Sequence, residues 1–363
     1  MAALDPDVLK SVQFLVFSKL EGAVTAGMIH LGDRLGLYRA LAAADTALTS
    51  AELAERTGLH ERWVREWAYN QAAARILGVT AGDDNGIGER FSVTPEVAAV
   101  LADPSSEAFG MGMFHRLPQT MATLEVLPDS FRTGIGHDFD SHGPEGAASL
   151  ERSFEPWNRA HLLPTVLPTL DGVVDKLAAG AAVADIGCGA GGAVLLMAAA
   201  FPASRFTGYD ISQFALARAC ERLAESGVGN AAFHDPRSSS LPSDGSLDLV
   251  TSFDCIHDMT DPHAMVAAIR GALADDGTWL LADVKAHDTF TQNVAKNPMA
   301  PLMYGISVLS CMSSGLSEPG GAGLGTLGMP AARAEAMARE AGFTRFRRLP
   351  VDHAINAFYE IRP

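Results

Sequence analysis

The second half of the chain alternates short apolar runs with longer segments of helical periodicity. Val183–Ile186 is such a run, and the segment Ala193–Ala200 behind it is a strong helix former. Further runs lie at 205–211, 230–235, 248–254, 277–285, 343–351 and 356–362. This alternation predicts an α/β fold, with helices on both faces of a mostly parallel sheet. Because residues 352–355 allow only a hairpin, we expect a seven-stranded mixed sheet whose last strand is antiparallel.

Residues 1–100 have a different pattern and are expected to form a separate domain. Residues 8–44 read as helices with long apolar faces that include Val12 and Leu15. Thr49-Ser-Ala-Glu52 is an N-cap signature for a helix ending near Gly58, and a second helix is expected over 61–77. Asp83-Asp84-Asn85-Gly86 lies between two β-prone stretches and indicates a hairpin. Helix, turn, helix and hairpin together predict a winged helix.

Two further segments complete the expected organisation. Residues 101–175 read as mostly helical with loops and are expected to form a linker and roof before a sheet domain over 176–363. Within that domain, 286–329 carries several methionines and a glycine-rich run at 320–328. This insertion is either a loose surface segment or a mobile lid whose Met and aromatic side chains adapt to an apolar ligand.

Charge and cysteine content narrow the classes of partner. The chain has 363 residues and a formal net charge of −16, and residues 1–100 carry 9 Lys and Arg against 13 Asp and Glu. Because nucleic-acid binding depends on basic side chains that neutralise phosphates, we expect no nucleic-acid partner. The four cysteines lie far apart, without the spacing of a zinc site or a disulfide framework. A reducing, cytoplasmic location is therefore expected.

No membrane association is expected from the apolar runs. The longest candidate, around 193–201, is confined by Gly192 and Pro202 and is too short to cross a bilayer. The N-terminus has no basic region followed by an apolar core, so we expect no export signal.

A glycine turn in the middle of the chain carries the main chemical signal. Asp185 lies near the end of a predicted apolar strand, and a turn that contains Gly187, Gly189 and Gly191 connects this strand to a predicted helix. Residues without a Cβ let a ligand lie against backbone amides at the start of a helix, which is typical of a nucleotide-type cofactor site. The same glycines also spell G-x-G-x-x-G, which alone would fit a dinucleotide. However, Asp185 stands where a dinucleotide fold carries an apolar residue.

Carboxylates at the ends of the next strands favour a different cofactor. Asp210 is placed to accept hydrogen bonds from two ribose hydroxyls, and Asp235 suits an adenine amino group. Together with 185–191 and 248–254, these motifs resemble the Rossmann-like class I S-adenosylmethionine-dependent methyltransferases over residues 176–363. The resemblance implies S-adenosyl-L-methionine as cofactor, S-adenosyl-L-homocysteine as product and no metal. The cofactor-binding residues that we predict are Asp185, Gly187, Cys188, Gly189, Gly191, Asp210, Ile211, Asp235, Pro236, Phe253 and Asp254.

The predicted catalytic residue follows the fourth strand. His257 stands at the carboxyl edge of the sheet, where ligands bind in open α/β folds. Residues 256–261 resemble the His-Asp segment of plant-type O-methyltransferases, in which the histidine is the general base. In that family an acid before the last helix orients the histidine, but residues 319–334 here contain no Asp or Glu, and Asp258 need not face the imidazole. His257 is thus either a general base or a residue that shapes the pocket.

The same family resemblance gives the winged helix a use. In plant-type and bacterial small-molecule O-methyltransferases such a domain mediates a homodimer and lines part of the substrate site, which implies both roles here. Side chains that could contact the acceptor, each of which could equally be a core residue, are Phe114, His115, Trp157, Met303 and Tyr304. We therefore expect methyl transfer to a small, largely apolar metabolite, at oxygen. The alternatives are decarboxylation or hydroxylation on the same fold, and a cofactor-sensing regulator that binds DNA.

Overall fold

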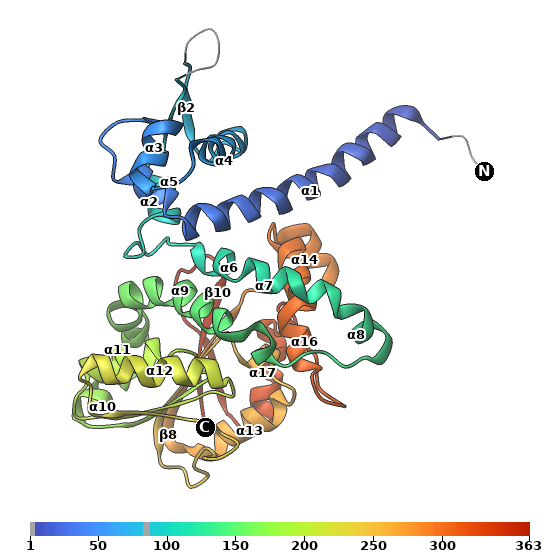
Figure 1. Cartoon of the computed structure of the whole chain (residues 1–363). Helices are drawn as coiled ribbons and strands as arrows, with labels where there is room; N and C mark the ends of the chain where they lie inside the picture. The colour runs from blue at the N-terminus through green and yellow to red at the C-terminus, as the bar shows by residue number, and fades with distance from the viewer. Residues whose placement is uncertain (1–3, 83–87) are drawn as a thin grey trace. The chain divides into compact units, whose positions relative to one another are not determined.

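The computed structural model describes residues 4–82 and 88–363 of the chain, which divides into two compact units between Pro118 and Gln119 (Figure 1). Residues 101–175, expected as one linker and roof, are shared between these units. Each unit has its own hydrophobic core, so each is described by itself.

The first unit has the expected order of helices and strands. Its elements are α1 (Pro6–Arg34), α2 (Leu37–Ala42), β1 (Leu48–Thr49), α3 (Ser50–Thr57), α4 (Glu61–Ala73), β2 (Gly78–Thr80), β3 (Arg90–Ser92), α5 (Pro95–Leu101) and α6 (Met111–His115). The strands form an antiparallel sheet in the order β1-β3-β2. A helix-turn-helix (α3 and α4) followed by paired strands is a winged helix, as predicted.

Local signals explain the boundaries of the two central helices. Thr49 caps α3, and Glu52 returns a hydrogen bond to the Thr49 amide at 2.7 Å, which completes the predicted capping box. Gly58 ends α3 with φ of +67°. Helix α4 ends at Ala73 rather than at 77 because Arg75 takes φ of +62° and the chain turns into β2. The predicted turn at Asp83–Gly86 lies outside the described residues.

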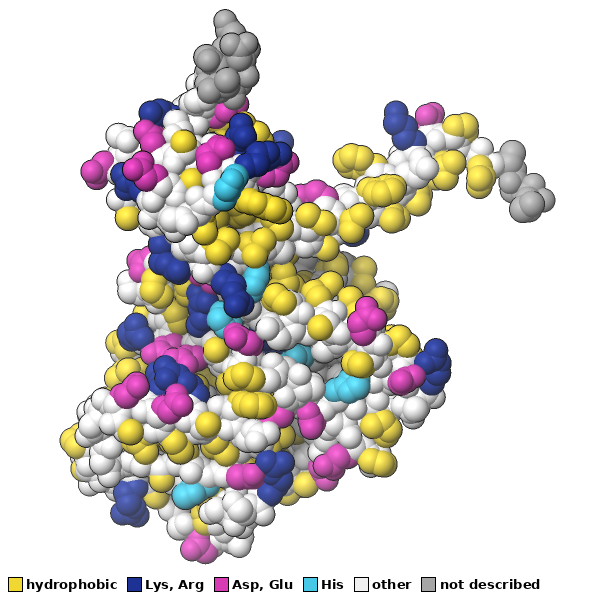
Figure 2. All heavy atoms as spheres, in the orientation of Figure 1, with side chains coloured by type: hydrophobic (Ala, Val, Ile, Leu, Met, Phe, Trp, Pro, Cys, Tyr) yellow, Lys and Arg dark blue, Asp and Glu magenta, His cyan; other side chains and the backbone are white. Residues whose placement is uncertain are grey.

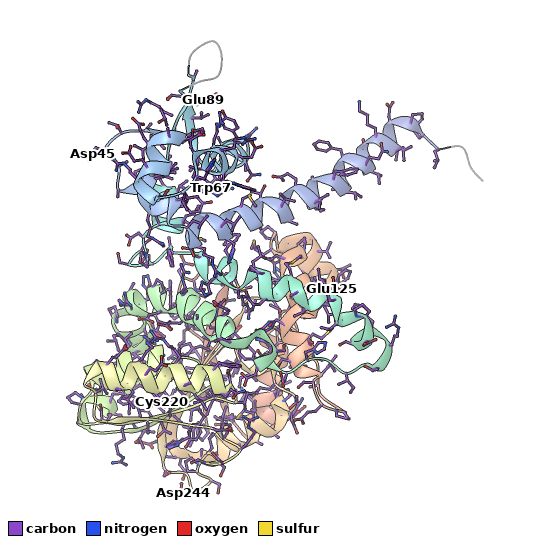
Figure 3. The ribbon with its side chains drawn as sticks, in the orientation of Figure 1. Asp45, Trp67, Glu89, Glu125, Cys220 and Asp244 are labelled. Atoms are coloured by element: carbon purple, nitrogen blue, oxygen red, sulfur yellow. The ribbon has the colours of Figure 1, made fainter. Side chains whose placement is uncertain are left out.

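The two tryptophans of α4 have different environments. Trp67 is buried, contacts the ring of Tyr38 and donates its indole N–H to the Met28 carbonyl at 2.9 Å (Figure 3). It therefore fixes α4 to α1 inside this unit. Trp63 is 79% exposed.

Helix α1 is long and unusually apolar on its surface. Asp5 caps it by accepting from the amides of Asp7 and Val8, and Pro6 begins it. Apolar side chains cover it over most of its length (Figure 2). Among the described residues it is the one helix that is long and apolar enough, by length and composition, to span a membrane. Of its most apolar 18-residue stretch, 6% is buried. The sequence prediction considered only uninterrupted apolar runs, and it passed over this helix because Lys10, Lys19 and Glu21 interrupt its apolar residues.

The second unit contains the larger sheet. Its helices are α8 (Leu127–Thr133), α9 (Gly143–His161), α10 (Val173–Ala179), α11 (Gly192–Ala200), α12 (Gln213–Ser226), α13 (Pro262–Ala272), α14 (Phe290–Lys296), α15 (Ala300–Ile306), α16 (Met312–Gly315) and α17 (Ala331–Glu340), and α7 (Leu117–Ala122) spans the boundary between the units. Its strands are β4 (Ala182–Ile186), β5 (Arg205–Tyr209), β6 (Ala231–His234), β7 (Leu247–Phe253), β8 (Leu273–Val284), β9 (Arg345–Arg348) and β10 (Asn356–Arg362). Shorter helical turns are η1 (Thr123–Glu125), η2 (Phe139–His142), η3 (Leu162–Val166), η4 (Leu167–Thr169), η5 (Ile256–Asp258) and η6 (Ser307–Cys311), of which η3 and η6 are π-helical.

The seven strands follow the order β6-β5-β4-β7-β8-β10-β9. Strands β4 to β8 are parallel, and β10 runs antiparallel to both β8 and β9. One face of the sheet packs on α13 and α17, and the other on α10 and α11. These three layers confirm the predicted mixed α/β sheet, and they bring the carboxyl ends of β4, β5 and β7 to one edge.

Two expectations about this unit need correction. The insertion 286–329 is not a loose loop, because it contains α14, α15, η6 and α16 before the glycine-rich run. Strand β8 begins at Leu273 rather than at 277, because Leu273 pairs with Leu247 before an irregularity in the register.

Candidate active site

The predicted glycine turn joins β4 to α11 at the carboxyl edge of the sheet. Gly187, Gly189 and Gly191 all have positive φ, of 68°, 54° and 75°. A Cβ on Gly187 would lie 2.4 Å from Cys255, whereas a Cβ on Gly189 would have no atom within 4 Å. Gly187 therefore permits the packing of the turn, and Gly189 leaves bare backbone beside open space, as a cofactor requires. Cys188 between them is buried.

Asp210 is tied to this turn. Its Oδ2 accepts from the amide of Gly189 and its Oδ1 from the amide of Ser212, each at 2.8 Å. Burial raises the pKa of this carboxyl. A carboxylate has about four lone-pair sites, so Asp210 keeps capacity for two hydroxyl donors. Ile211, which follows it, is half exposed.

Asp235 has a partner that the sequence reasoning missed. The guanidinium of Arg237 binds both carboxylate oxygens of Asp235, at 2.7 to 3.0 Å, and also donates to the Ile211 carbonyl at 2.7 Å. This hydrogen bonding lowers the pKa of Asp235. A purine at this position would therefore meet an ion pair rather than a free carboxylate. Pro236 lies between the two paired residues and is partly buried.

Two other predicted cofactor residues are held by neighbouring strands. Asp185 is buried in β4, where its Oδ1 accepts from the Thr251 hydroxyl of β7 at 2.6 Å, and burial raises its pKa to about 7. Asp254 follows the partly buried Phe253 with φ of +49°, and its Oδ2 accepts from Asn356 Nδ2 at 2.6 Å. Burial and the nearby Asp283 raise the pKa of Asp254 to about 7.

His257 forms a buried dyad with Asp283. The Nδ1 of His257 donates to Asp283 Oδ1 at 2.9 Å, and both residues are 2% exposed. His257 comes from η5 after β7, and Asp283 from the end of the adjacent strand β8. Asp283 thus supplies the orienting acid that residues 319–334 lack. Sequence reasoning missed it, although a carboxylate at the end of the next parallel strand was the signal available.

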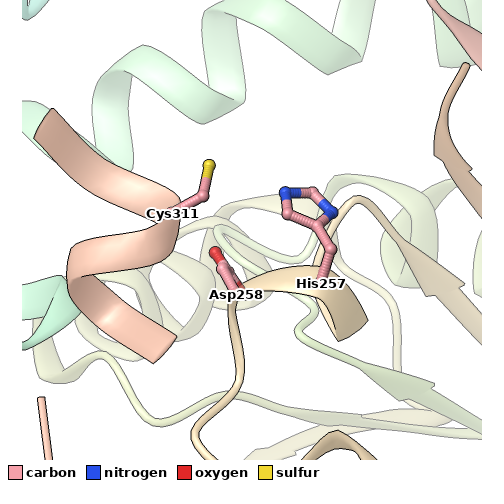
Figure 4. A group of neighbouring side chains, drawn as sticks. All are labelled: His257, Asp258 and Cys311. Atoms are coloured by element: carbon pink, nitrogen blue, oxygen red, sulfur yellow. The ribbon is translucent and has the colours of Figure 1, made fainter. Parts of the chain in front are cut away.

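The surroundings of His257 favour its charged form. Burial alone would lower the pKa of the imidazole, but the charge and hydrogen bond of Asp283, together with Cys311, hold the pKa well above its ordinary value. Asp258 and Cys311 lie beside the same ring, and the ligand atoms of the three residues are within 4.8 Å of one another (Figure 4). Burial raises the pKa of Asp258 to about 7, against the charge of His257.

The predicted substrate residues have varied surroundings. Trp157 stacks on Phe358 and contacts His161 and His353, so it packs against the core of the second unit. Met303 and Tyr304 are partly buried in α15, and Tyr304 contacts the ring of Phe290.

The remaining two belong to the first unit. Phe114 packs against its core, and the Phe114 carbonyl accepts from His30 Nδ1 at 2.8 Å. His115 is partly buried. A contact of any of these five side chains with substrate stays a prediction.

Two family matches agree with this architecture. Residues 177–313 match the family described as a methyltransferase domain, and residues 23–102 match the Rv2258c-like winged HTH domain. The polyketide synthase ThaQ of Burkholderia thailandensis is 36% identical over 106 residues, which are 29% of this chain. This segment spans 5% of the length of that synthase.

Solved structures share the fold of the whole chain. Human N-acetylserotonin methyltransferase in complex with SAM is 15% identical, with a TM-score of 0.68 over 100% of this chain and 99% of that chain. The mitomycin 7-O-methyltransferase is 20% identical, with a TM-score of 0.68 over 99% of both chains. A putative O-methyltransferase from Nostoc punctiforme is 17% identical, with a TM-score of 0.72 over 96% of this chain and 98% of that one.

The fold, the glycine turn and the family matches together define the class of the protein. The chain contains a methyltransferase domain over residues 177–313 and a winged helix-turn-helix domain over residues 23–102, and its fold is that of the solved O-methyltransferases. Both domains agree with the sequence prediction, and the human N-acetylserotonin methyltransferase structure contains SAM, the cofactor that the sequence predicts for this chain.

Proposed function

We propose that the protein transfers a methyl group from S-adenosylmethionine to a hydroxyl oxygen of a small, largely apolar metabolite, with His257 as the general base. The buried His257–Asp283 dyad carries this proposal. A buried carboxylate that accepts from one imidazole nitrogen is the arrangement that prepares a histidine for proton transfer. The proposal is also supported by the similarity of fold to the mitomycin 7-O-methyltransferase and to an O-methyltransferase of neocarzinostatin biosynthesis in complex with SAM and 2-hydroxy-5-methyl naphthoic acid.

The residues at the edge of the sheet fit this cofactor. The positive φ and open surroundings of Gly189 leave room for a ligand against the backbone, and Asp210 stands beside it with lone pairs to spare. Asp254, Asp258 and Asp283 place carboxyl groups near His257. This acidic surrounding suits a cationic ligand.

His257 and Asp283 have different roles in the proposed reaction. When bound, S-adenosylmethionine supplies a methyl group on a positively charged sulfur, already activated for displacement. His257 Nε2 accepts the proton of the acceptor hydroxyl, since Nδ1 is held by Asp283. Asp283 fixes the ring orientation and tautomer and stabilises the imidazolium that results. Because the pKa of His257 is raised, the base is strong but requires deprotonation before each turnover.

The acceptor and setting are also part of the proposal. Met303 and Tyr304 in α15 offer an adaptable apolar surface for the acceptor. We also propose a role in secondary metabolism, which is supported by the similarity of 106 residues of this chain to a polyketide synthase. Four free cysteines support a reducing, cytoplasmic location.

A homodimer through the first unit completes the proposal. The exposed apolar side chains of α1 over its first five turns are Val8, Leu9, Val12, Phe14, Leu15, Val16, Phe17, Leu20 and Val24. A second copy of the chain would remove this surface from water, which such an apolar face requires. Nucleic acid is not part of this proposal, because the acidic charge of residues 1–100 opposes phosphate binding.

The His257→Gln variant tests the catalytic proposal against a panel of phenols, alcohols and carboxylic acids. We expect cofactor affinity to persist and turnover of hydroxyl acceptors to fall about 10²–10⁴-fold. Raising the pH should partly rescue a phenol, whose pKa near 10 lets it ionise without help. A carboxylate acceptor should be nearly indifferent to the substitution.

Two outcomes would contradict the proposal. Near-normal turnover of a hydroxyl acceptor by the Gln variant would eliminate the base role. Release of carbon dioxide, or gain of oxygen without methylation in the product, would instead support the alternative chemistries of this fold.

A further inference from the structure

We propose that His257, Asp258 and Cys311 form a binding site for one zinc ion. Their ligand atoms all lie within 4.8 Å of one another, and they come from η5 and from the end of η6 (Figure 4). Imidazole, carboxylate and thiolate are the ligands that Zn²⁺ takes in proteins, whereas Mg²⁺ and Ca²⁺ prefer oxygen alone. The donor set therefore selects a borderline-soft ion.

The spacing of the three side chains fits a tetrahedral ion after a small movement. With Zn–S of about 2.3 Å and Zn–N and Zn–O of about 2.0–2.2 Å, ligand atoms around zinc lie about 3.3–3.6 Å apart. The present spacing is up to 4.8 Å, so binding requires the ligand atoms to approach by about 1.2–1.5 Å. Three protein ligands leave the fourth position open to water or an acceptor.

Asp283 provides the support that a zinc-bound histidine needs. Metal-ligating histidines generally donate their second ring N–H to a carboxylate, which fixes the tautomer and leaves the other nitrogen free for the metal. His257 Nδ1 donates to Asp283 Oδ1 at 2.9 Å, and Asp283 Oδ2 is buried with no partner among the described residues. Cys311 lies in a π-helical turn, a feature frequent at functional sites.

Zinc binding and base catalysis exclude one another at this histidine. An ion on Nε2 occupies the lone pair that would accept the hydroxyl proton, and binding releases the thiol proton of Cys311. Zinc therefore inhibits the methyl transfer. This consequence rests on the proposed function, but the binding of the ion does not.

Cobalt spectroscopy of the purified, cofactor-free chain tests the site. We expect one Co²⁺ per chain, with visible bands of tetrahedral cobalt and a near-ultraviolet thiolate-to-cobalt band, both lost when Zn²⁺ is added. Cys311→Ser should abolish the thiolate band, and Asp283→Asn should weaken binding about 10–100-fold, the usual effect of losing such a supporting carboxylate. The control is Cys220→Ser, since Cys220 is an exposed cysteine on α12 and should leave the spectrum unchanged (Figure 3).

The readouts separate failure of the site from failure of the function. Circular dichroism and thermal melting of Cys311→Ser establish that the variant is folded. A thiolate band that persists in this folded variant, or disappears in Cys220→Ser, would overturn the site, as would wild-type protein that takes up no cobalt at one equivalent. Zinc inhibition that a chelator reverses, and that Cys311→Ser reduces, would support the link to methyl transfer. Because spectra do not depend on turnover, an inactive methyltransferase would leave the metal test intact.

Discussion

Replacing Asp283 by Asn should lower the pKa of His257, because the charge of Asp283 is the main cause that raises it. The two side chains are 2% exposed and share a 2.9 Å hydrogen bond, so solvent screens the interaction little. A hydrogen bond to a charged group is worth about 1.5–3 kcal/mol, roughly twice a bond between neutral groups, so the loss of the charge should be measurable. Asparagine keeps an oxygen for the imidazole N–H but removes the charge that stabilises the imidazolium.

The titration can be followed without knowledge of the acceptor. In protein labelled at histidine Cε1, the chemical shift of each ring reports its protonation against pH, and His257→Gln identifies the signal of His257. We expect the wild-type signal to titrate above about 6.5, the ordinary value for histidine. The control is Asp261→Asn, which keeps the cap of α13 at Ala264 and removes an exposed carboxylate four residues from His257.

Two results would refute this reasoning. A wild-type His257 that titrates at or below the ordinary value would show that burial, rather than Asp283, dominates. An unchanged titration in Asp283→Asn, or an equal change in Asp261→Asn, would show that Asp283 does not set the proton affinity of His257.

Three further predictions concern the cofactor, the interface and stability. Asp210→Ala should weaken S-adenosylhomocysteine binding at least tenfold, as measured by calorimetry, because charge-assisted hydrogen bonds are worth about 1.5–3 kcal/mol each. The control is Asp244→Ala on an exposed loop, a variant that should bind the ligand normally (Figure 3). Leu15→Glu on α1 should convert a sedimenting dimer to monomer, and a wild-type monomer would contradict the interface. Asp185→Asn should raise the melting temperature of cofactor-free protein at pH 8 and change it little at pH 4, close to the unfolded pKa of aspartate. Because burial raises the pKa of Asp185 to about 7 in the folded protein, its protonated carboxyl stabilises the fold fully below the unfolded pKa, and this stabilisation is lost as the pH rises through 7. An equal effect of the substitution at both pH values would contradict this account.

The strands could be predicted because each is an apolar run with a polar end. The last strand, Asn356–Arg362, has the predicted bounds, and α11 begins within one residue of expectation. These signals are local in sequence, and burial between helical layers makes them strong. The same locality explains the correct capping box at Thr49.

Contacts between distant segments could not be predicted in this way. The partner of His257 lies 26 residues further along, and the dyad depends on the register that pairs Phe253 with Ala282. The ion pair of Asp235 with Arg237 is local, because the two residues are two positions apart, and its signal was a cation directly after the carboxylate at the strand end. The glycine-rich run at 320–328 suggested that the insertion 286–329 is a loop, although this run follows the helices of the insertion.

The position of β10 has a consequence for how the protein is made. This strand follows all the others in the chain, yet in the sheet it lies between β8 and β9, and its first residue, Asn356, holds Asp254 at the site. During synthesis, β9 leaves the ribosome without a neighbour, and β8 presents an unpaired apolar edge until residues 356–362 arrive. The sheet edge at the candidate active site is therefore completed only after residues 356–362 are translated, and a chain interrupted before them leaves β8 unpaired on that side.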